Sequence, residues 1–211
     1  PFVSKTAWPP TLMPGMDGIE LCKTIKQDIS TSHIPVLMLT AKSSVEDQVK
    51  CFNAGVNGYL TKPFEIKMLY ARIDNLMKSN QKRQQKFRTD TEINIVALEY
   101  QTNDELFLKK AVECIETHLI ESEFDIDTFA SELSVSKSTL NRKIKVMTGL
   151  SSIEFIRNIR LKHACILLKK PFVNISEVAY AVGFTNPKYF TKCFKNEFNV
   201  TPTEYQKQKE E

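Results

Sequence analysis

The sequence is poor in the residues that build metal sites and disulfide frameworks. Among its 211 residues there are only five cysteines and three histidines. The cysteines are widely scattered, no two of them stand at CxxC spacing, and the histidines do not cluster with them, which argues against a zinc site. We therefore expect five free and buried thiols, as a reducing compartment favours, and neither a metal nor a cofactor.

Long apolar runs are lacking as well. No stretch approaches the roughly 18 apolar residues that a membrane-spanning helix needs. Residues 1–10 also lack the charged and then apolar plan of a signal peptide. We expect a cytoplasmic segment without membrane contact of its own, and a longer natural protein that contains it is compatible with a membrane anchor elsewhere.

A strong net charge is missing too, but the charge is unevenly distributed. The formal net charge is +4, from 29 Lys and Arg against 25 Asp and Glu. Residues 104–135 carry nine acidic residues against two lysines, whereas residues 136–211 carry 14 basic residues against six acidic ones. Segregation over whole segments slightly favours nucleic acid as a partner of the last third over a solvated surface of no specific role.

The first half alternates helix-like and strand-like patterns. Apolar spacing predicts helices over three ranges and short buried strands over two; the helices are Asp17–Gln27, Ser44–Ala54 and Phe64–Asn80, and the strands are Pro35–Thr40 and Gly58–Thr61. Helices that alternate with strands indicate a doubly wound α/β fold with a parallel sheet.

Three motifs in this half carry a resemblance. Met13–Gly18 (MPGMDG), Leu39–Ala41 (LTA) and Tyr59–Phe64 (YLTKPF), in this order and spacing, resemble the response-regulator receiver domain. The resemblance implies that Thr40 is the hydroxyl and Lys62 the ammonium group that sense an aspartyl phosphate. It also implies a cis peptide bond before Pro63. An ammonium group and a movable hydroxyl donor are chemically suited to a phosphate.

The same resemblance predicts a phospho-acceptor Asp four residues before Pro14, and that position is Pro10. Residues 1–12 are unmatched and contain no acidic pair that would hold Mg²⁺. We therefore expect a partial receiver over residues 13–80, with two parallel strands and three helices, that binds no Mg²⁺ and is not phosphorylated on Asp. Thr40 and Lys62 are then remnants of the switch, and the open sheet of this α/β remnant favours a homodimer.

Residues 81–103 are predicted to be a linker. The run from Lys78 to Arg88 is polar and basic, so it either extends the preceding helix or forms solvated coil, and a solvated tether is favoured over contact with DNA. Glu92–Tyr100 has some strand character without an evident partner.

The second half contains an internal repeat. Residues 126–135 align with residues 175–184 at an offset of 49, and the offset becomes 50 from Ser136 onward. Each copy reads as a short helix, a tight turn and a second helix. Ser136 caps the first copy, Asn186 and Pro187 begin the second, and Gly183 marks its turn. This is the helix-turn-helix pattern twice.

One long helix over Ser152–Lys170 is predicted between the copies. At 1.5 Å per residue this helix is about 28 Å long, close to the length of one turn of DNA, about 34 Å. The second helix of each helix-turn-helix copy is therefore expected to enter one of two successive major grooves. His163 lies on the packing face of this helix and is expected to be a packing residue rather than a ligand.

A second resemblance covers residues 104–208. Its motifs are Leu140–Lys145 (LNRKIK), Thr148–Gly149, Ile159–Ala164 (IRLKHA), Val178–Phe184 (VAYAVGF), Tyr189–Phe190 and Thr201–Tyr205 (TPTEY), and they are similar to the AraC-type DNA-binding domain. The resemblance implies an all-α domain with two helix-turn-helix motifs joined by a long helix, and double-stranded DNA as partner. A receiver followed by this domain resembles the output end of hybrid two-component regulators, in which a kinase precedes both in a longer chain.

Helix geometry divides each second helix into an inner and an outer face. Leu140 and Ile144 are predicted to point inward in the first copy, and Phe190 and Phe194 in the second. The resemblance makes Ser138, Asn141 and Arg142 the base-facing set, because Asn suits adenine and Arg suits guanine. The remaining candidate DNA contacts are Lys145, Pro187, Lys188, Tyr189 and Lys192, of which Lys145, Lys188 and Lys192 suit phosphate and Tyr189 is equally compatible with the core.

The reading that best fits these patterns is a sequence-specific DNA-binding transcription regulator, the output end of a phosphorelay, and not an enzyme. Two alternatives stay open: a phosphoryl-accepting receiver, and an interaction module in which the face formed by residues 44–80 dimerises. No nucleophile stands beside a base in the sequence, and no Gly-rich phosphate loop is present.

Overall fold

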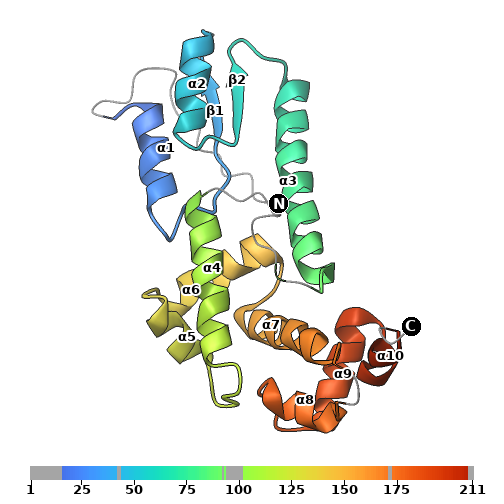
Figure 1. Ribbon diagram of the computed structural model, residues 1–211. Helices are drawn as coiled ribbons and strands as arrows, with labels where there is room; N and C mark the ends of the chain where they lie inside the picture. The colour runs from blue at the N-terminus through green and yellow to red at the C-terminus, as the bar shows by residue number, and fades with distance from the viewer. Residues whose placement is uncertain (1–15, 42–43, 92, 94–101, 171–172, 209–211) are drawn as a thin grey trace. The chain divides into compact units, whose positions relative to one another are not determined.

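The computed structural model describes residues 16–41, 44–91, 93, 102–170 and 173–208, and it divides into two compact units (Figure 1). The first unit comprises residues 1–73 and the second comprises residues 74–211. Within the described residues, no helix is both long and apolar enough to cross a lipid bilayer. All five cysteines are buried free thiols, as the sequence predicts.

The first unit is built around a two-stranded parallel sheet. Strands β1 (Leu37–Thr40) and β2 (Gly58–Thr61) pair in register from Leu37 opposite Gly58 to Thr40 opposite Thr61. Helix α1 (Gly18–Gln27) precedes the sheet, and helix α2 (Val45–Asn53) connects the strands. Both helices begin at a side-chain cap, Asp17 for α1 and Ser44 for α2. The predicted α/β arrangement with two parallel strands is confirmed, although β1 begins two residues later than predicted.

The described core of the first unit is small. Its buried cluster consists of Cys22, Cys51 and Val56, with a few half-buried neighbours. A buried lysine adds polar ties: the ammonium group of Lys26 donates to the carbonyl oxygen of Ile34 at 2.7 Å and to Asn57 Oδ1 at 2.9 Å. These bonds join the end of α1 to the entry of both strands, and they satisfy a charge that would be costly to bury alone.

Helix α3 (Ile66–Thr89) is longer than predicted. The basic run from Lys78 to Arg88 continues the helix, so the alternative of a solvated tether was wrong for this part. The physical reason is Phe87, which is 3% exposed and packs in the core of the second unit. Burial of this one apolar side chain holds the otherwise polar run in place. Residues 92 and 94–100 of the predicted linker strand lie outside the described residues.

After α3, the regular elements that the structure describes in the second unit are all helices. Its helices are α4 (Thr102–Thr117), α5 (Ile126–Glu132), α6 (Lys137–Thr148), α7 (Ser152–Leu167), α8 (Ile175–Ala181), α9 (Pro187–Phe198) and α10 (Pro202–Lys207). Helix α7 ends three residues before the predicted end, so it spans about 24 Å instead of about 28 Å. The predicted long helix between the two motifs is otherwise confirmed.

Two hydrophobic clusters share α7. Phe155, Ile156 and Ile159 from its first half pack in a cluster with α4, α5, α6 and Phe87. Leu161, Ala164 and Cys165 from its second half pack in a cluster with α8, α9 and α10. Each helix-turn-helix motif therefore has its own core. Helix α7 contributes side chains to both cores and so fixes the spacing of the two motifs.

Candidate nucleic-acid interface

The first helix-turn-helix motif is formed by α5 and α6. Asp125 accepts the backbone N–H of Thr128 at the start of α5, and Ser136 Oγ accepts the N–H of Thr139 at 3.1 Å at the start of α6. The turn between the helices uses Ser134 in the left-handed region, with φ of 53°. Helix α6 ends at Gly149, whose φ of 74° lets the chain reverse.

The second motif is formed by α8 and α9 and repeats this plan. Gly183 takes the left-handed turn position with φ of 78°. Asn186 Oδ1 accepts the N–H groups of Lys188 and Tyr189, and Pro187 stands in the first helical turn. Helix α9 ends at Asn199, with φ of 61°. The predicted caps and the predicted turn glycine are confirmed.

The inner faces of α6 and α9 are buried as predicted. Leu140, Ile144, Phe190 and Phe194 each have an exposed fraction of 0%. Phe190 and Phe194 belong to a chain of aromatic contacts, with ring centroids 5.8 Å apart. Since these residues fix which side of each helix faces the core, they also fix the side that remains for a partner.

The candidate base-facing set lies on the outside of α6. Ser138, Asn141 and Arg142 are exposed, as is Lys145 one turn further on. Asn141 has an additional internal role that the sequence does not reveal: its Oδ1 accepts the N–H of Ser152 at 3.3 Å, at the start of α7. Lys137, at the beginning of α6, forms an ion pair with Asp127 of α5.

The candidate set on α9 is more mixed. Lys188 and Lys192 are exposed, whereas Pro187 is half-buried and its carbonyl oxygen accepts the hydroxyl of Thr191 at 3.0 Å. Tyr189 is 50% exposed, and its ring centroid lies 6.2 Å from that of Phe184. Tyr189 therefore lies at the edge of the core with half of its surface available to a partner.

A cleft opens between the two motifs. Its volume is about 650 Å³, and it is lined by α5, the outer face of α6, α7 and the turn before α9, including Asn141 and Tyr189 from the two candidate sets. The structure thus brings residues of both sets to one cleft, although they are nearly 50 positions apart in the sequence.

Two arginines of α7 line this cleft, and both are missing from the sequence-based site. Arg160 is 9% exposed and donates from its guanidinium group to the carbonyl oxygens of Gly183 and Glu121. Burial lowers the pKa of Arg160 from its usual value. Arg157 lies three positions earlier, therefore on the same side of the helix, and is half-buried. The signal that identifies them is the i, i+3 spacing of two basic residues on a helix between two helix-turn-helix motifs.

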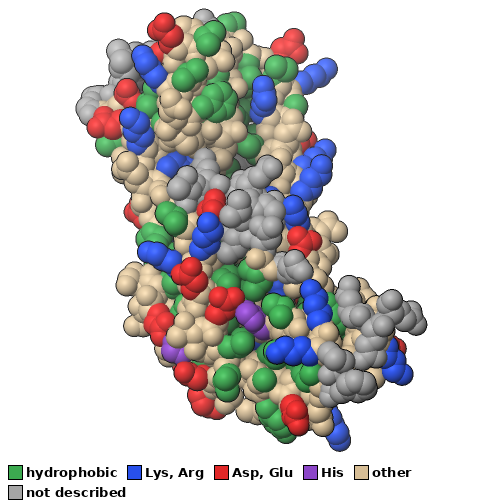
Figure 2. Space-filling model, in the orientation of Figure 1, with side chains coloured by type: hydrophobic (Ala, Val, Ile, Leu, Met, Phe, Trp, Pro, Cys, Tyr) green, Lys and Arg blue, Asp and Glu red, His purple; other side chains and the backbone are tan. Residues whose placement is uncertain are grey.

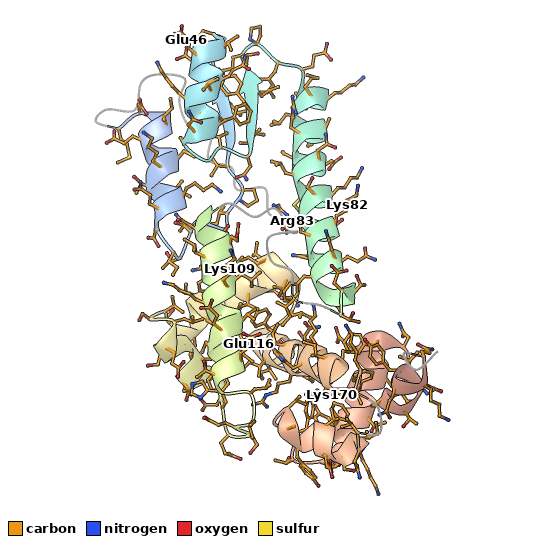
Figure 3. All side chains as sticks on the ribbon, in the orientation of Figure 1. Glu46, Lys82, Arg83, Lys109, Glu116 and Lys170 are labelled. Carbon is orange, nitrogen blue, oxygen red and sulfur yellow. The ribbon has the colours of Figure 1, made fainter. Side chains whose placement is uncertain are left out.

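The acidic segment of the sequence, residues 104–135, includes α4 and α5, and three of its acidic residues, Glu123, Asp125 and Asp127, line this cleft. Figure 2 shows Asp and Glu side chains gathered over α4 and α5. There the ring of His118 contacts Glu121 at 2.9 Å and Glu132 at 2.6 Å, and these hydrogen bonds raise the pKa of His118, with Glu121 contributing most. His163 of α7 contacts Glu116, which lies on α4 as labelled in Figure 3, at 2.9 Å. His163 is thus a half-buried packing residue that bonds to a neighbouring helix.

The candidate switch residues of the first unit lie at the C-terminal ends of the two parallel strands. Thr40 ends β1, and the N–H of Lys62 donates to the carbonyl oxygen of Thr40 at 2.7 Å. The peptide bond between Lys62 and Pro63 is cis, as the resemblance implies, and the Lys62 side chain is exposed. Position 10, where the acceptor Asp is expected, lies outside the described residues.

Comparison with known protein families matches two domains. Residues 11–74 match the response regulator receiver domain, and residues 129–208 match a helix-turn-helix domain. Histidine kinase P4 of Formosa agariphila is 43% identical over 195 residues, which are 92% of this chain and 14% of the kinase. The HTH-type transcriptional regulator MtrA of Neisseria gonorrhoeae is 38% identical over 88 residues, 42% of this chain and 29% of MtrA. The chain thus spans less than a third of the length of either relative.

A solved structure that is similar to part of this chain is the C-terminal domain of AraT, a response regulator from Geobacillus stearothermophilus. It is 31% identical, with a TM-score of 0.44, and the match covers 48% of this chain and 84% of that domain. The matches to known families and the described geometry agree on both halves of the sequence. The chain combines a response-regulator receiver domain over residues 11–74 with an AraC-type helix-turn-helix domain over residues 129–208.

Proposed function

We propose that this chain is the DNA-binding output part of a two-component transcription regulator, located in the cytoplasm. The observation that carries the proposal is that two helix-turn-helix motifs pack against one helix, α7, and expose polar residues on the outer faces of α6 and α9. A helix of this kind enters a major groove with its N-terminal residues against base edges, and two such motifs on one side read neighbouring grooves.

The division of labour between the motifs follows from the side chains that they expose. Asn141 and Arg142 on α6 are suited to bidentate contacts with adenine and guanine, and Ser138 reaches either. On α9, Pro187 offers no side-chain donor, and Lys188 and Lys192 are point charges suited to phosphate. The first motif therefore specifies sequence, and the second mainly positions the protein on the duplex.

Arg157 extends this interface between the two motifs. It lies half-buried in the cleft that Asn141 and Tyr189 also line, on the helix that fixes the spacing of the motifs. Of the three acidic residues along the same cleft, Asp127 pairs with Lys137, Asp125 caps α5, and Glu123 accepts the hydroxyl of Ser122. Arg157 is thus the basic group placed to contact the DNA backbone between the two grooves.

The experiment that tests the proposal is selection of duplexes from a random pool by the purified chain. Two short conserved blocks with centres about 10 base pairs apart are expected, because that spacing places two major grooves on one side of the duplex. Failure to enrich any sequence, with a binding constant equal for selected and random duplexes, would contradict sequence-specific binding.

The receiver part is proposed to lack its phospho-acceptor. Pro10 stands where the receiver pattern places the acceptor Asp, and proline has no group that accepts a phosphoryl group. Treatment with acetyl phosphate and Mg²⁺ should leave no hydroxylamine-labile phosphate on the chain. An acyl phosphate mapped to any Asp of residues 13–80 would contradict this part of the proposal.

A homodimer through the first unit is supported by exposed apolar side chains. On α2, Val45 is 75%, Val49 51% and Phe52 54% exposed, and Ile66 at the start of α3 is 68% exposed. Apolar side chains that gather on one helix are typical of a covered surface, and a second copy is the partner we propose. Light scattering should give twice the chain mass for the wild type and the single mass for Phe52→Glu. A monomeric wild type at micromolar concentration would exclude the dimer.

A further inference from the structure

The first recognition helix, α6, is held from outside the helix-turn-helix match. The match begins at residue 129, whereas the last turns of α3 end at Thr89, 40 positions earlier in the sequence. These turns belong to the second unit, with α6. Figure 3 labels Lys82 and Arg83, the two α3 residues that directly precede Gln84.

The contact is made at the carbonyl end of α6. The side-chain amide of Gln84 donates to the carbonyl oxygen of Val146 at 2.7 Å and approaches that of Lys145 at 3.4 Å. The amide of Asn80, one turn earlier on α3, donates to the same Val146 oxygen at 3.2 Å. The last four carbonyl groups of a helix have no partner within the helix, so the two amides of α3 act as a C-terminal cap supplied by another helix.

The same residue also covers the end of α6. A Cβ atom at Gly149, the residue that ends α6, would lie 3.4 Å from Gln84 Oε1 and 3.5 Å from Gln84 Cβ, so the Gln84 side chain rests directly on the glycine. The left-handed conformation of Gly149 and the Gln84 side chain therefore close this end of the helix together.

Phe87 fixes the position of these amides. Its ring stacks on Phe155 of α7 with centroids 5.6 Å apart and lies in the hydrophobic cluster that contains the inner face of α6. The ammonium group of Lys162 donates to the Phe87 carbonyl oxygen and lies 4.4 Å from the Phe87 ring centroid. A backbone carbonyl and a ring held at once by a lysine that is 1% exposed leave α3 little freedom to slide along α7.

We infer that the last turns of α3 are a positioning element for DNA reading, in which Asn80 and Gln84 hold the carbonyl end of α6. The inference rests on the proposed function and deepens it. Asn80 and Gln84 touch α6 at the end opposite to Ser138, so they act on base contacts through the helix and not on the DNA directly. A looser end lets α6 take several orientations, which lowers affinity for a selected duplex more than for a random one.

The test uses the full chain with Gln84→Met, which keeps the length of the side chain and removes its donors. The matched control is Gln85→Met, the same change on the next, exposed position of α3. A double variant, Asn80→Leu with Gln84→Met, removes both amides. The probes are a duplex selected by the wild-type chain and a random duplex of equal length, both measured over a range of salt concentrations.

We expect the ratio of the two affinities to fall roughly threefold in Gln84→Met and roughly tenfold in the double variant, as lost hydrogen bonds of ordinary strength imply. The salt dependence and the random-duplex affinity should stay at the wild-type level, and hydrogen exchange at the Thr148 and Gly149 amides should accelerate. Gln85→Met should match the wild type in all respects.

A ratio within about 1.5-fold of the wild type in the double variant would overturn the inference. So would an equal loss of affinity for both duplexes, because that is the signature of lost folded protein and not of a misplaced helix. A wild-type chain that selects no duplex would instead overturn the proposed function, which keeps the two failures distinguishable.

Discussion

The two helix-turn-helix motifs have left-handed residues at the same two positions, but glycine occupies a different one of these positions in each motif. In the turn, the first motif has Ser134 with φ of 53° and the second has Gly183 with φ of 78°. At the end of the second helix, the first motif has Gly149 and the second has Asn199, again both left-handed. The difference teaches that the backbone sets the conformation, whereas the surroundings decide which residue is tolerated.

The surroundings differ because each glycine is covered by another part of the fold. A Cβ at Gly183 would lie 2.4 Å from the carbonyl oxygen of Leu119 and 2.9 Å from Arg160 Cζ. At Gly149 the three nearest atoms to an added Cβ all belong to the Gln84 side chain, the closest at 3.4 Å. The second motif therefore has a rigid backbone contact at its turn, and the first has an adjustable side-chain contact at its end.

Gly183→Ala should produce the largest effect on this comparison. The added Cβ must displace the backbone at Leu119 as well as occupy a left-handed conformation, so a loss of about 3 kcal/mol in the free energy of unfolding is expected. Hydrogen exchange at the α8 and α9 amides measures it. Gly149→Ala is the matched variant, with about 1 kcal/mol expected from conformation alone. Equal losses of unfolding free energy in Gly183→Ala and Gly149→Ala would contradict the difference between a backbone contact at Gly183 and a side-chain contact at Gly149.

Lys162 sharpens the comparison, because through Phe87 it holds α3 against the hydrophobic cluster of the first motif. Burial lowers the pKa of Lys162 from 10.5 to about 8. Between pH 8 and 10.5 the unfolded chain binds more protons at this group than the folded one, so stability rises with pH, by about 1 kcal/mol from pH 7 to 9. Urea unfolding at several pH values should show this rise in the wild type relative to Lys162→Met.

The pH window of that measurement is set by two thiols. Burial raises the pKa of Cys165 to about 11, and burial together with Glu132 raises that of Cys114 to about 12. Unfolding then releases protons from these thiols above about pH 9, which lowers stability and opposes the effect of Lys162. The difference between wild type and variant below pH 9 isolates Lys162, and a flat difference would contradict its assignment.

Arg157→Ala tests whether the region between the motifs touches DNA. Loss of one phosphate contact should lower the slope of the logarithm of the binding constant against the logarithm of salt concentration by about 0.9. Discrimination between bases should stay intact, because phosphate carries no sequence information. Fluorescence anisotropy with a selected duplex measures both, and an unchanged slope would place Arg157 outside the interface.

Ser134→Gly should have the smallest effect, and a favourable one. A serine in the left-handed region is strained, and glycine relieves the strain while it adds freedom to the unfolded chain, so a gain of about 0.5 kcal/mol is expected. Thermal unfolding by circular dichroism detects it. A loss of stability would mean that the Ser134 side chain contributes more than its backbone strain costs.

The sequence was sufficient to predict the features that depend on residues close together in the chain, namely helix caps, turns and the buried faces of helices. Ser136 and Asn186 cap the helices that their positions predict, Gly183 turns the chain, and the buried faces of α6 and α9 follow helical spacing. The 49- and 50-residue offsets also pair the left-handed positions of the two motifs. Local chemistry and periodicity are enough for these features.

The sequence was insufficient where the decisive contact is distant. Phe87 stands in a basic run that reads as solvated, and its contact with Phe155, 68 positions later, helps to place the end of α3 in the second unit. Lys162 belongs to a residue type that is rarely buried, yet it is 1% exposed because the Phe87 carbonyl oxygen accepts from it. The roles of Arg157 and Arg160 depend in the same way on a cleft that only the packed fold creates.

The most direct test of the account is the effect of every base substitution in a selected duplex on binding by wild type, Arg142→Ala and Lys192→Ala. The account predicts that Arg142→Ala loses about 1–3 kcal/mol of discrimination at a single base pair. It predicts that Lys192→Ala weakens binding to all sequences alike and flattens the salt dependence. Wild-type behaviour of both variants would contradict the assignment of α6 and α9 as the helices that contact DNA.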